Sequence, residues 1–195
     1  MSIYELKILF DLNPESKSKV LCKYANKFKL SYFFVDSEDG HCYWFDRYGK
    51  EKDVSLIHEI NEDMISRDIK KIVIPKNVMR IKISAFEDCN ELKSVTIPDS
   101  VINIGYYAFG YCYSLMRVTI PNSITTIGSG AFYGCSGLTS VTIPNSVANI
   151  GYSVFYSCDN LKSLVFKGKT IDQVKAMKTY PFGIKDESII KAELS

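Results

Sequence analysis

The sequence predicts an α+β protein whose main part is a short solenoid of about four stacked repeat units. The first observation is a 23-residue phrase that recurs almost unchanged at 92–114, 115–137 and 138–160, with a looser copy at 69–91. The second is that each copy carries apolar residues at fixed positions, so one unit alone cannot bury its hydrophobic side and neighbours must stack. The third is that residues 1–68 and 167–195 do not repeat, which predicts a small α+β N-terminal cap and a helix/strand C-terminal cap around a solenoid at 69–166.

Each copy begins with a strand whose residues alternate between inward and outward positions. In the third full copy Leu138, Val141 and Ile143 are predicted to point inward. Each strand is followed by a proline, which lacks the N–H needed to continue a ladder; these prolines are Pro75, Pro98, Pro121 and Pro144. The predicted outward residues are Lys93, Ser94, Thr96, Met116, Arg117, Thr119, Thr139, Ser140 and Thr142. We interpret this Ser/Thr-rich surface as a solvated strand face.

The second half of each copy carries a glycine and then a phenylalanine at fixed positions. The glycines are Gly105, Gly128 and Gly151, and they suit either a positive φ or a very close approach of two backbones. The phenylalanines are Phe109, Phe132 and Phe155, and they are predicted to stack in the core. Each fully buried ring contributes up to roughly 3 kcal/mol.

The last fixed position of each copy is a cysteine: Cys89, Cys112, Cys135 and Cys158. Stacked strands lie about 4.8 Å apart, so these thiols are predicted to form a straight inward-facing row. Thiols in a straight row do not surround a single point as the four ligands of a tetrahedral zinc site do. Their Cα–Cβ bonds are parallel, which is a poor orientation for a disulfide between neighbours. We therefore expect reduced, buried thiols that act as small hydrophobic groups, with no metal and no cofactor.

The Pro, Gly, Phe, Cys and Leu positions that recur together resemble the BspA-like class of bacterial leucine-rich repeats, over about residues 69–166. The resemblance implies a right-handed solenoid with strands on a concave face and irregular, strand-like segments behind them. It also implies a surface-exposed or secreted protein. The first copy departs from the pattern, since Lys82 stands where the next copy has Gly105, and we interpret it as a degenerate but joined unit.

The two ends need separate predictions. In front of the repeats we expect an amphipathic helix at 16–28, a hairpin of strands 30–35 and 41–46 joined across Asp39-Gly40, and a second helix at 54–69. Behind them, Thr170 and Gln173 form a capping-box pattern that predicts a short helix at 171–178, followed by an apolar segment at 188–194. This tail resembles C-terminal caps of related repeat proteins, some of them encoded by phages.

Composition and charge narrow the cellular setting. No apolar run is long enough to span a membrane, and the N-terminal residues lack the apolar stretch of a signal peptide, which predicts a cytoplasmic protein. Residues 1–68 hold 10 Lys/Arg against 13 Asp/Glu, whereas residues 69–195 hold 14 against 9. The repeats show no basic stripe in the sequence, so direct nucleic-acid binding is not expected.

No arrangement of residues predicts catalysis. The two histidines are His41 and His58, and a pairing of Cys22 or Cys42 with His58 has no supporting motif. The acidic cluster Asp36, Glu38 and Asp39 lacks the later ligand of a calcium loop and is interpreted as a hairpin tip. We therefore assign no enzyme activity.

The predicted function is a non-enzymatic module that binds a protein partner through the repeat surface. The candidate residues are Arg117, Thr119 and Thr142 on the strand face, and Tyr107, Tyr111 and Tyr133 on a tyrosine-rich edge. The alternatives are a phage-encoded inhibitor of a host defence effector and a phage or cell-surface adhesion component, with an enzyme hidden in residues 1–68 ranked last. The partner and the oligomeric state are left open.

Overall fold

The computed structural model describes residues 32–35, 42–45, 51–52, 57–65 and 67–194. The chain divides into two compact units, one formed by Met1–Phe34 and Tyr43–Val54 and the other by Val35–Cys42 and Ser55–Ser195. The two expected aromatic strands are present as β1 (Tyr32–Val35) and β2 (Cys42–Phe45), neighbours in a three-stranded sheet with β3 (Glu51–Lys52). The helix expected at 16–28 and the turn at Asp39-Gly40 lie outside the described residues.

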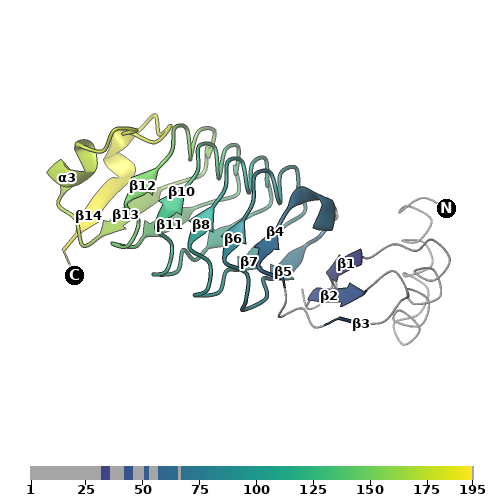
Figure 1. Ribbon diagram of the computed structural model, residues 1–195. Helices are drawn as coiled ribbons and strands as arrows, with labels where there is room; N and C mark the ends of the chain where they lie inside the picture. The colour runs from purple at the N-terminus through teal and green to yellow at the C-terminus, as the bar shows by residue number, and fades with distance from the viewer. Residues whose placement is uncertain (1–31, 36–41, 46–50, 53–56, 66, 195) are drawn as a thin grey trace. The chain divides into compact units, whose positions relative to one another are not determined.

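The larger unit is a solenoid built on two parallel sheets (Figure 1). The six-stranded sheet contains β5 (Lys71–Val73), β7 (Ser94–Thr96), β9 (Arg117–Val118), β11 (Ser140–Ile143), β13 (Ser163–Lys167) and β14 (Ile190–Glu193). The five-stranded sheet contains β4 (Glu59–Ile60), β6 (Arg80–Ile81), β8 (Asn103–Ile104), β10 (Thr126–Ile127) and β12 (Asn149–Ile150). Strand order in both sheets follows the chain. The pairs β5/β6, β7/β8, β9/β10 and β11/β12 each add one short strand to each sheet, whereas β4, β13 and β14 each extend one sheet alone.

The solenoid has about six coils, not the four expected from the strict repeat. The additional coils lie at the ends, where the period changes. At the front, Glu59 of β4 aligns with Arg80 of β6, and at the back, Ile190 of β14 aligns with Leu164 of β13. A search for the 23-residue phrase misses both coils because these pairings depend on backbone hydrogen bonding and not on the spacing of the phrase.

The helix expected at 54–69 is wrong for the part that the structure describes. That segment contains strand β4 and a 3₁₀ turn, η3 (Glu62–Met64). Ile57, Ile60 and Ile65 are buried, as the apolar pattern indicated, but Ile60 is buried beside Ile81 as a strand residue. The exposed edge of β6 supplies the reason: its backbone groups need partners, and an added strand satisfies them where a helix does not.

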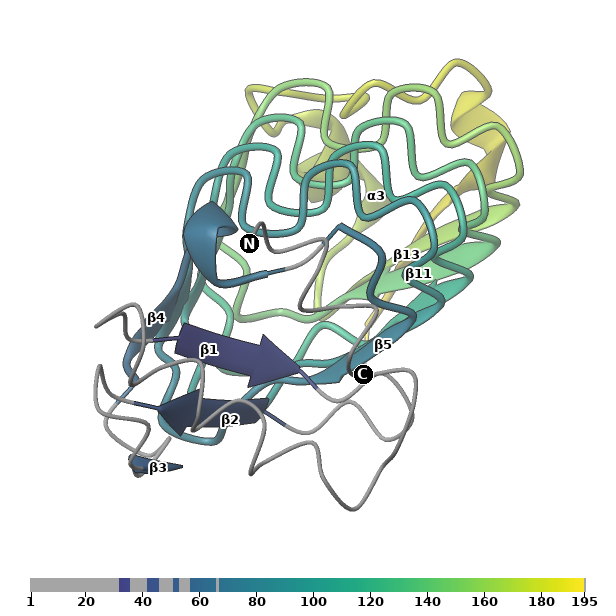
Figure 2. The same ribbon diagram turned by 90° about the vertical axis from the view of Figure 1, so that its right-hand side faces the viewer.

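The third side of each coil has no regular strand but is hydrogen-bonded between coils in the same way. The N–H groups of Phe86, Phe109 and Phe132 donate to carbonyl oxygens one coil further on, at 2.7, 2.8 and 3.1 Å. Viewed along the solenoid, successive coils follow nearly the same path (Figure 2). The resemblance implied irregular, strand-like segments behind the strand face; the structure has turns on this side and a second sheet of short regular strands on another.

The core contains a continuous column of phenylalanine rings. Phe86, Phe109, Phe132 and Phe155 are fully buried or nearly so. Successive ring centroids lie 4.9, 5.3 and 5.8 Å apart, with ring planes within 2° of parallel. The predicted Phe stack is confirmed, and its spacing follows from the strand separation of the sheets beside it.

The recurrent glycines allow adjacent coils to approach closely. A Cβ on Gly105 would lie 2.6 Å from the carbonyl carbon of Lys82, and one on Gly128 would lie 2.7 Å from that of Gly105. Neither Gly105 nor Gly128 has a positive φ. Of the two reasons expected for these glycines, close backbone approach is therefore the one that holds.

The C-terminal segment extends both the ladder and the core. The capping box is formed, with the Thr170 hydroxyl accepting from the Gln173 N–H at 3.3 Å, and helix α3 (Ile171–Lys175) ends three residues earlier than expected. After it, Phe182 accepts a hydrogen bond from the Phe155 N–H at 3.0 Å, and its ring lies 5.2 Å from that of Phe166. A second 3₁₀ turn, η4 (Glu187–Ile189), leads into β14.

Replacing Phe132 by alanine is expected to lower the free energy of unfolding by about 3–5 kcal/mol, because it leaves a cavity in the middle of the ring column. Chemical denaturation of the full chain measures this loss. The exposed substitution Thr142→Ala serves as the control and is expected to change stability by less than about 0.5 kcal/mol. A similar small effect for Phe132→Ala would contradict the stacking.

Replacing Gly128 by alanine is expected to cost about 1–3 kcal/mol, since the added methyl group meets the backbone of the preceding coil. Thermal melts of this variant and of Thr126→Ala, a neighbouring substitution that adds no atoms, make the comparison. Equal melting temperatures for the two variants would show that the coils tolerate a wider spacing than the structure gives.

Candidate functional site

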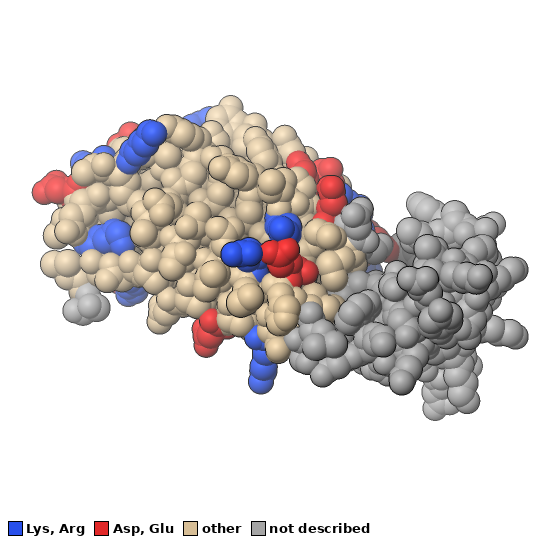
Figure 3. Space-filling model, viewed as in Figure 1, with Lys and Arg blue, Asp and Glu red and all other residues tan. Residues whose placement is uncertain are grey.

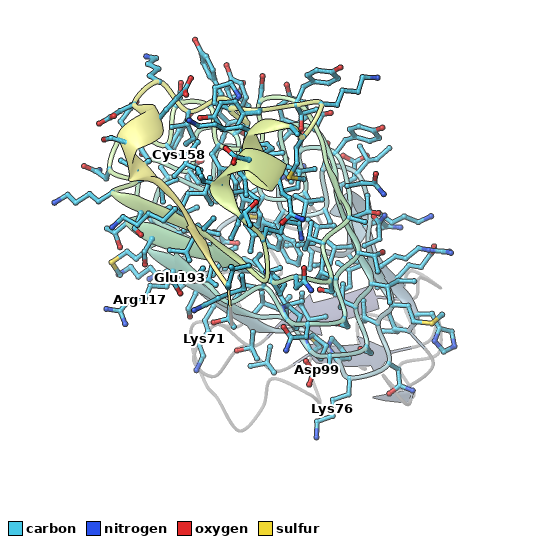
Figure 4. All side chains as sticks on the ribbon, turned by 90° about the vertical axis from the view of Figure 1, so that its left-hand side faces the viewer. Lys71, Lys76, Asp99, Arg117, Cys158 and Glu193 are labelled. Atoms are coloured by element: carbon cyan, nitrogen blue, oxygen red, sulfur yellow. The ribbon has the colours of Figure 1, made fainter. Side chains whose placement is uncertain are left out.

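The predicted strand-face residues lie together on the six-stranded sheet. Arg117, Thr119 and Thr142 are all exposed, and Arg117 aligns with Ser94 on one neighbouring strand and Ser140 on the other. Figure 4 shows Arg117 extending away from the sheet, on the outer side of the solenoid. The three residues help to line a shallow hollow of about 320 Å³, which also includes Ser140 and Lys167. The surface therefore combines hydroxyl groups with cationic side chains.

The predicted tyrosines lie on the irregular side of the coils and contact one another. We call Tyr107, Tyr111, Tyr133 and Tyr156 the tyrosine cluster. The Tyr133 ring is at its centre, with centroids 5.7 Å from Tyr107, 5.3 Å from Tyr111 and 5.1 Å from Tyr156. Burial and the neighbouring tyrosines raise the pKa of the Tyr111 hydroxyl above its ordinary value.

Tyr107 and Tyr111 adopt an unusual backbone conformation, with φ of 50° and 59°. The equivalent residues of the next coil are Gly130 and Gly134, whose φ values are also positive. A Cβ on Gly130 would lie 2.8 Å from the Tyr107 ring, so this ring packs directly over the glycine. A tyrosine in this conformation costs of order 1–3 kcal/mol, and ring packing over a bare backbone offsets part of that cost.

The three tyrosines chosen from the sequence are partly buried, and other tyrosines nearby are more exposed. Tyr106, Tyr113, Tyr152 and Tyr156 have exposed fractions of 55, 49, 56 and 40%. The structure thus brings the tyrosines together on one side and the Arg117 group together on another. They form two candidate surfaces, not one combined site.

The side of the five-stranded sheet is nearly uncharged. Its charges gather over β4 and β6, as Figure 3 shows, where Glu59 accepts from Arg80 at 3.2 Å and from Lys82 at 2.9 Å. Hydrogen bonds from Lys82 and Arg80 lower the pKa of Glu59, and because the group is exposed the pairs add little stability. Beyond this cluster, the outward strand residues are Asn103, Thr126 and Asn149.

Three cations of the six-stranded sheet, Lys71, Lys167 and Lys191, were not among the predicted site residues. Lys71 occupies the same outward register as Ser94 and Arg117, and the repeat alignment could have found it. Lys191 lies on β14, beside Val165. No alignment on the repeat could have found Lys191, because β14 joins the sheet outside the 23-residue period.

The cysteine row has a structural role. Cys89, Cys112, Cys135 and Cys158 are buried, as predicted. The thiols of Cys112, Cys135 and Cys158 donate to the carbonyl oxygens of Phe86, Phe109 and Phe132 at 3.1, 3.0 and 3.1 Å. Each bond ties one coil to the coil before it. Burial raises the pKa of Cys89 and of Cys158 to about 12, and raises that of Cys135 as well.

In the described part of the chain, no group of three or more His, Cys, Asp or Glu side chains is arranged to hold a metal ion. None of the five described cysteines is in a disulfide. None of the helices in this part of the chain has the length and apolar character needed to cross a bilayer.

The sequence of residues 64–182 matches the model of the BspA type leucine-rich repeat region, in six copies. The match covers more than half of the chain, and the chain belongs to this family of repeat proteins. Its members are in general modules for protein interaction or surface proteins, and nothing in the match indicates an enzyme. A comparison with curated protein sequences gave no match.

Solved structures with the same fold include the pneumococcal vaccine antigen PcpA (20% identity, TM-score 0.54), with which the match covers 84% of this chain and 34% of that one. A second is a leucine-rich repeat protein from Bacteroides ovatus (23% identity, TM-score 0.50), where the match covers 71% of this chain and 48% of that one. A third is a leucine rich cell surface protein from Faecalibacterium prausnitzii (24% identity, TM-score 0.53), where the match covers 73% of this chain and 42% of that one. The chain spans about a third to a half of the length of these proteins. The likeness establishes the fold. The phage-type resemblance of the last residues is not supported by these comparisons.

Raised thiol pKa values predict how stability depends on pH. The buried thiols stay neutral in the folded state, whereas in the unfolded state they ionise near their ordinary value of about 9. Their contribution is therefore complete below pH 9 and is lost as the pH rises toward 12. We expect the free energy of unfolding to fall across this interval, and Cys135→Ala to reduce the slope. An unchanged slope would contradict this role of the buried thiols.

Thiol labelling gives a separate test. At pH 8 the row of cysteines should resist alkylation in the native protein, because thiolates are the reactive form and burial disfavours them. In denaturant without reductant all six cysteines of the chain should react. Fewer reactive thiols, with matching disulfide-linked peptides in a mass spectrum, would overturn the prediction of reduced cysteines.

Proposed function

We propose that this protein is a non-enzymatic interaction module that binds a protein partner through the outer surface of its repeats. The observation that carries the proposal is the rigid six-stranded sheet, which presents Arg117 among exposed Ser and Thr side chains over a shallow hollow. Arginine is enriched at the energetically dominant positions of protein interfaces, because its planar guanidinium forms several hydrogen bonds at once.

Rigidity favours this surface as a binding site. The inner strands β7, β9, β11 and β13 are held on both sides by neighbouring strands, and the column of Phe rings packs the core behind them. Binding to such a surface orders few additional groups, so less free energy is lost on association. The ends of the array offer less continuous surface, and we therefore propose a contact near its middle.

The tyrosine side is the second part of the proposed surface. Tyrosine side chains provide large contact area at low cost in conformational entropy. Tyr106, Tyr113, Tyr152 and Tyr156 are exposed there. The rings of Tyr107 and Tyr111 pack against Tyr133, and this layer also contacts Tyr113 and Tyr156. We propose that Tyr107, Tyr111 and Tyr133 contribute mainly by fixing this layer, with their exposed edges in contact with the partner.

Adhesion at a cell surface is the alternative function. The support for this alternative is that the Faecalibacterium prausnitzii protein of the same fold is described as a cell surface protein. A third candidate is a phage-encoded inhibitor of a host defence effector that acts by surface contact. The interaction module is proposed to act in the cytoplasm. Fractionation of native cells with an antibody to the protein distinguishes it from a surface adhesin.

Replacing Arg117 and Thr119 together by glutamate is expected to weaken binding of a partner, identified by affinity capture from native cells, by about tenfold or more. The melting temperature should stay unchanged, because both side chains are exposed. The matched control is Lys178→Glu with Thr125→Glu, which makes the same change in net charge elsewhere. Calorimetric titration with the purified partner measures the affinities.

Full-affinity binding by the Arg117 and Thr119 variant, together with loss of binding on deletion of residues 1–54 in a protein that stays folded, would place the functional surface in the part of the chain before the solenoid. The repeats would then serve as a scaffold. Failure to capture any partner from cells that contain the full chain would overturn the proposed function itself.

A further inference from the structure

The register of the six-stranded sheet places cations and hydroxyl groups in one row. Lys71, Ser94, Arg117, Ser140 and Ser163 are aligned across five neighbouring strands. A second row contains Thr96 and, on β11, Thr142. Neighbouring parallel strands lie about 4.8 Å apart, so hydroxyl groups follow each other at that spacing between the cationic side chains. Figure 4 shows Lys71 and Arg117 on the same outer side of the solenoid.

Further cations border these rows. Lys93 and Lys162 directly precede β7 and β13, and Lys191 lies on β14; all three are exposed. The acidic side chains nearby are Glu91 and Glu193, and each is already engaged in an ion pair, with Lys70 and Lys167 respectively. Asp99 lies beyond the strand ends and lines a different hollow together with Lys76.

The result is an excess of uncompensated positive charge on one sheet. Among the described residues, none of Lys71, Lys93, Arg117, Lys162 and Lys191 has an acidic side chain within ion-pair distance. The five-stranded sheet differs, since its cations Arg80 and Lys82 are paired with Glu59. The sequence did not indicate this asymmetry, because the cations come from separate coils and gather only when the coils stack.

We propose that the six-stranded sheet binds an acidic segment of a protein partner, with a carboxylate seated in the hollow at Arg117. This deepens the proposed function and rests on it. A guanidinium donates two parallel N–H hydrogen bonds to a carboxylate. The hydroxyls of Thr119, Ser140 and Thr142 line the same hollow and can donate to the remaining lone pairs. Lys71 and Lys191 lie on strands to either side and attract further carboxylates of the segment.

The same face is poorly suited to a nucleic acid. Single-stranded nucleic acids are held by aromatic side chains on which bases stack, and the outward residues of β5, β7, β9, β11, β13 and β14 include no aromatic side chain. The exposed tyrosines lie on the irregular side of the coils instead. A protein that binds duplex DNA neutralises several neighbouring phosphates with Lys and Arg side chains. On this sheet, uncharged hydroxyl groups separate the cations.

A labelled polyglutamate peptide is the probe, with fluorescence anisotropy on the full chain as the measurement. At low ionic strength the wild-type protein should bind the peptide, and added salt should weaken binding. The variant Lys71→Glu with Arg117→Glu should raise the dissociation constant roughly tenfold or more. The matched control is Lys178→Glu with Lys185→Glu, which changes the net charge equally at exposed positions away from this sheet; it should stay within about twofold of wild type.

Several results would overturn the proposal. One is absence of polyglutamate binding by the wild-type protein at low salt. Another is an equal loss of affinity in the control variant, which would show a response to net charge alone. Tighter binding of a single-stranded oligonucleotide of the same charge would assign the face to nucleic acid.

The outcome is separable from that of the proposed function. A captured partner that binds the Lys71 and Arg117 variant as tightly as wild type would refute the acidic-segment proposal while the interaction function stands. Circular dichroism melts of both double variants confirm that each is folded before its affinity is interpreted.

Discussion

Backbone hydrogen bonding between successive coils is the constraint on which the rest of the structure depends. On two sides of each coil it forms parallel strands, and on the third it joins segments such as Phe86 to Ala108 and Phe109 to Ala131. Bonds on three sides leave the coils only a narrow range of separation, near the 4.8 Å of paired strands. Every residue must therefore fit beneath its equivalent in the next coil. This requirement explains why Phe, Cys, Leu and Gly recur at fixed positions.

The same constraint sets the character of the core. Phe rings spaced 4.9 to 5.8 Å apart stack nearly parallel because their backbones are held at that distance. Glycine is needed at 105 and 128 because a Cβ there would meet the backbone of the adjacent coil. The cysteines add a bond from each thiol to a carbonyl of the preceding coil, so a small apolar residue also satisfies a buried acceptor. Stability is thus distributed along the stack and depends on neighbours.

Stacking also creates the candidate surfaces. Outward residues that lie 23 positions apart in the chain become neighbours, so a single Arg117 gains Ser94 and Ser140 beside it. On the irregular side, tyrosines from successive coils meet in the tyrosine cluster, and Tyr107 accepts a left-handed backbone conformation to pack over Gly130. One side is hydroxyl-rich and cationic and the other is aromatic. The two offer different chemistry to a partner, and the cationic sheet carries the more specific expectation.

The sequence by itself determined the repeat architecture, the inward and outward positions of each strand, the Phe column, the buried cysteine row and the capping box at Thr170. These features are periodic or local, so each can be recognised from spacing and from the chemistry of a few adjacent residues. Only the tertiary structure decided that β4, in place of a helix, and β14 extend the two sheets at the ends, and that Lys71, Arg117 and Lys191 gather on one sheet. At the ends of the array the chain leaves the 23-residue period. There, the unpaired N–H and C=O groups of the neighbouring coil determine that the segment forms a strand. The sequence of the segment does not show that these groups lie beside it.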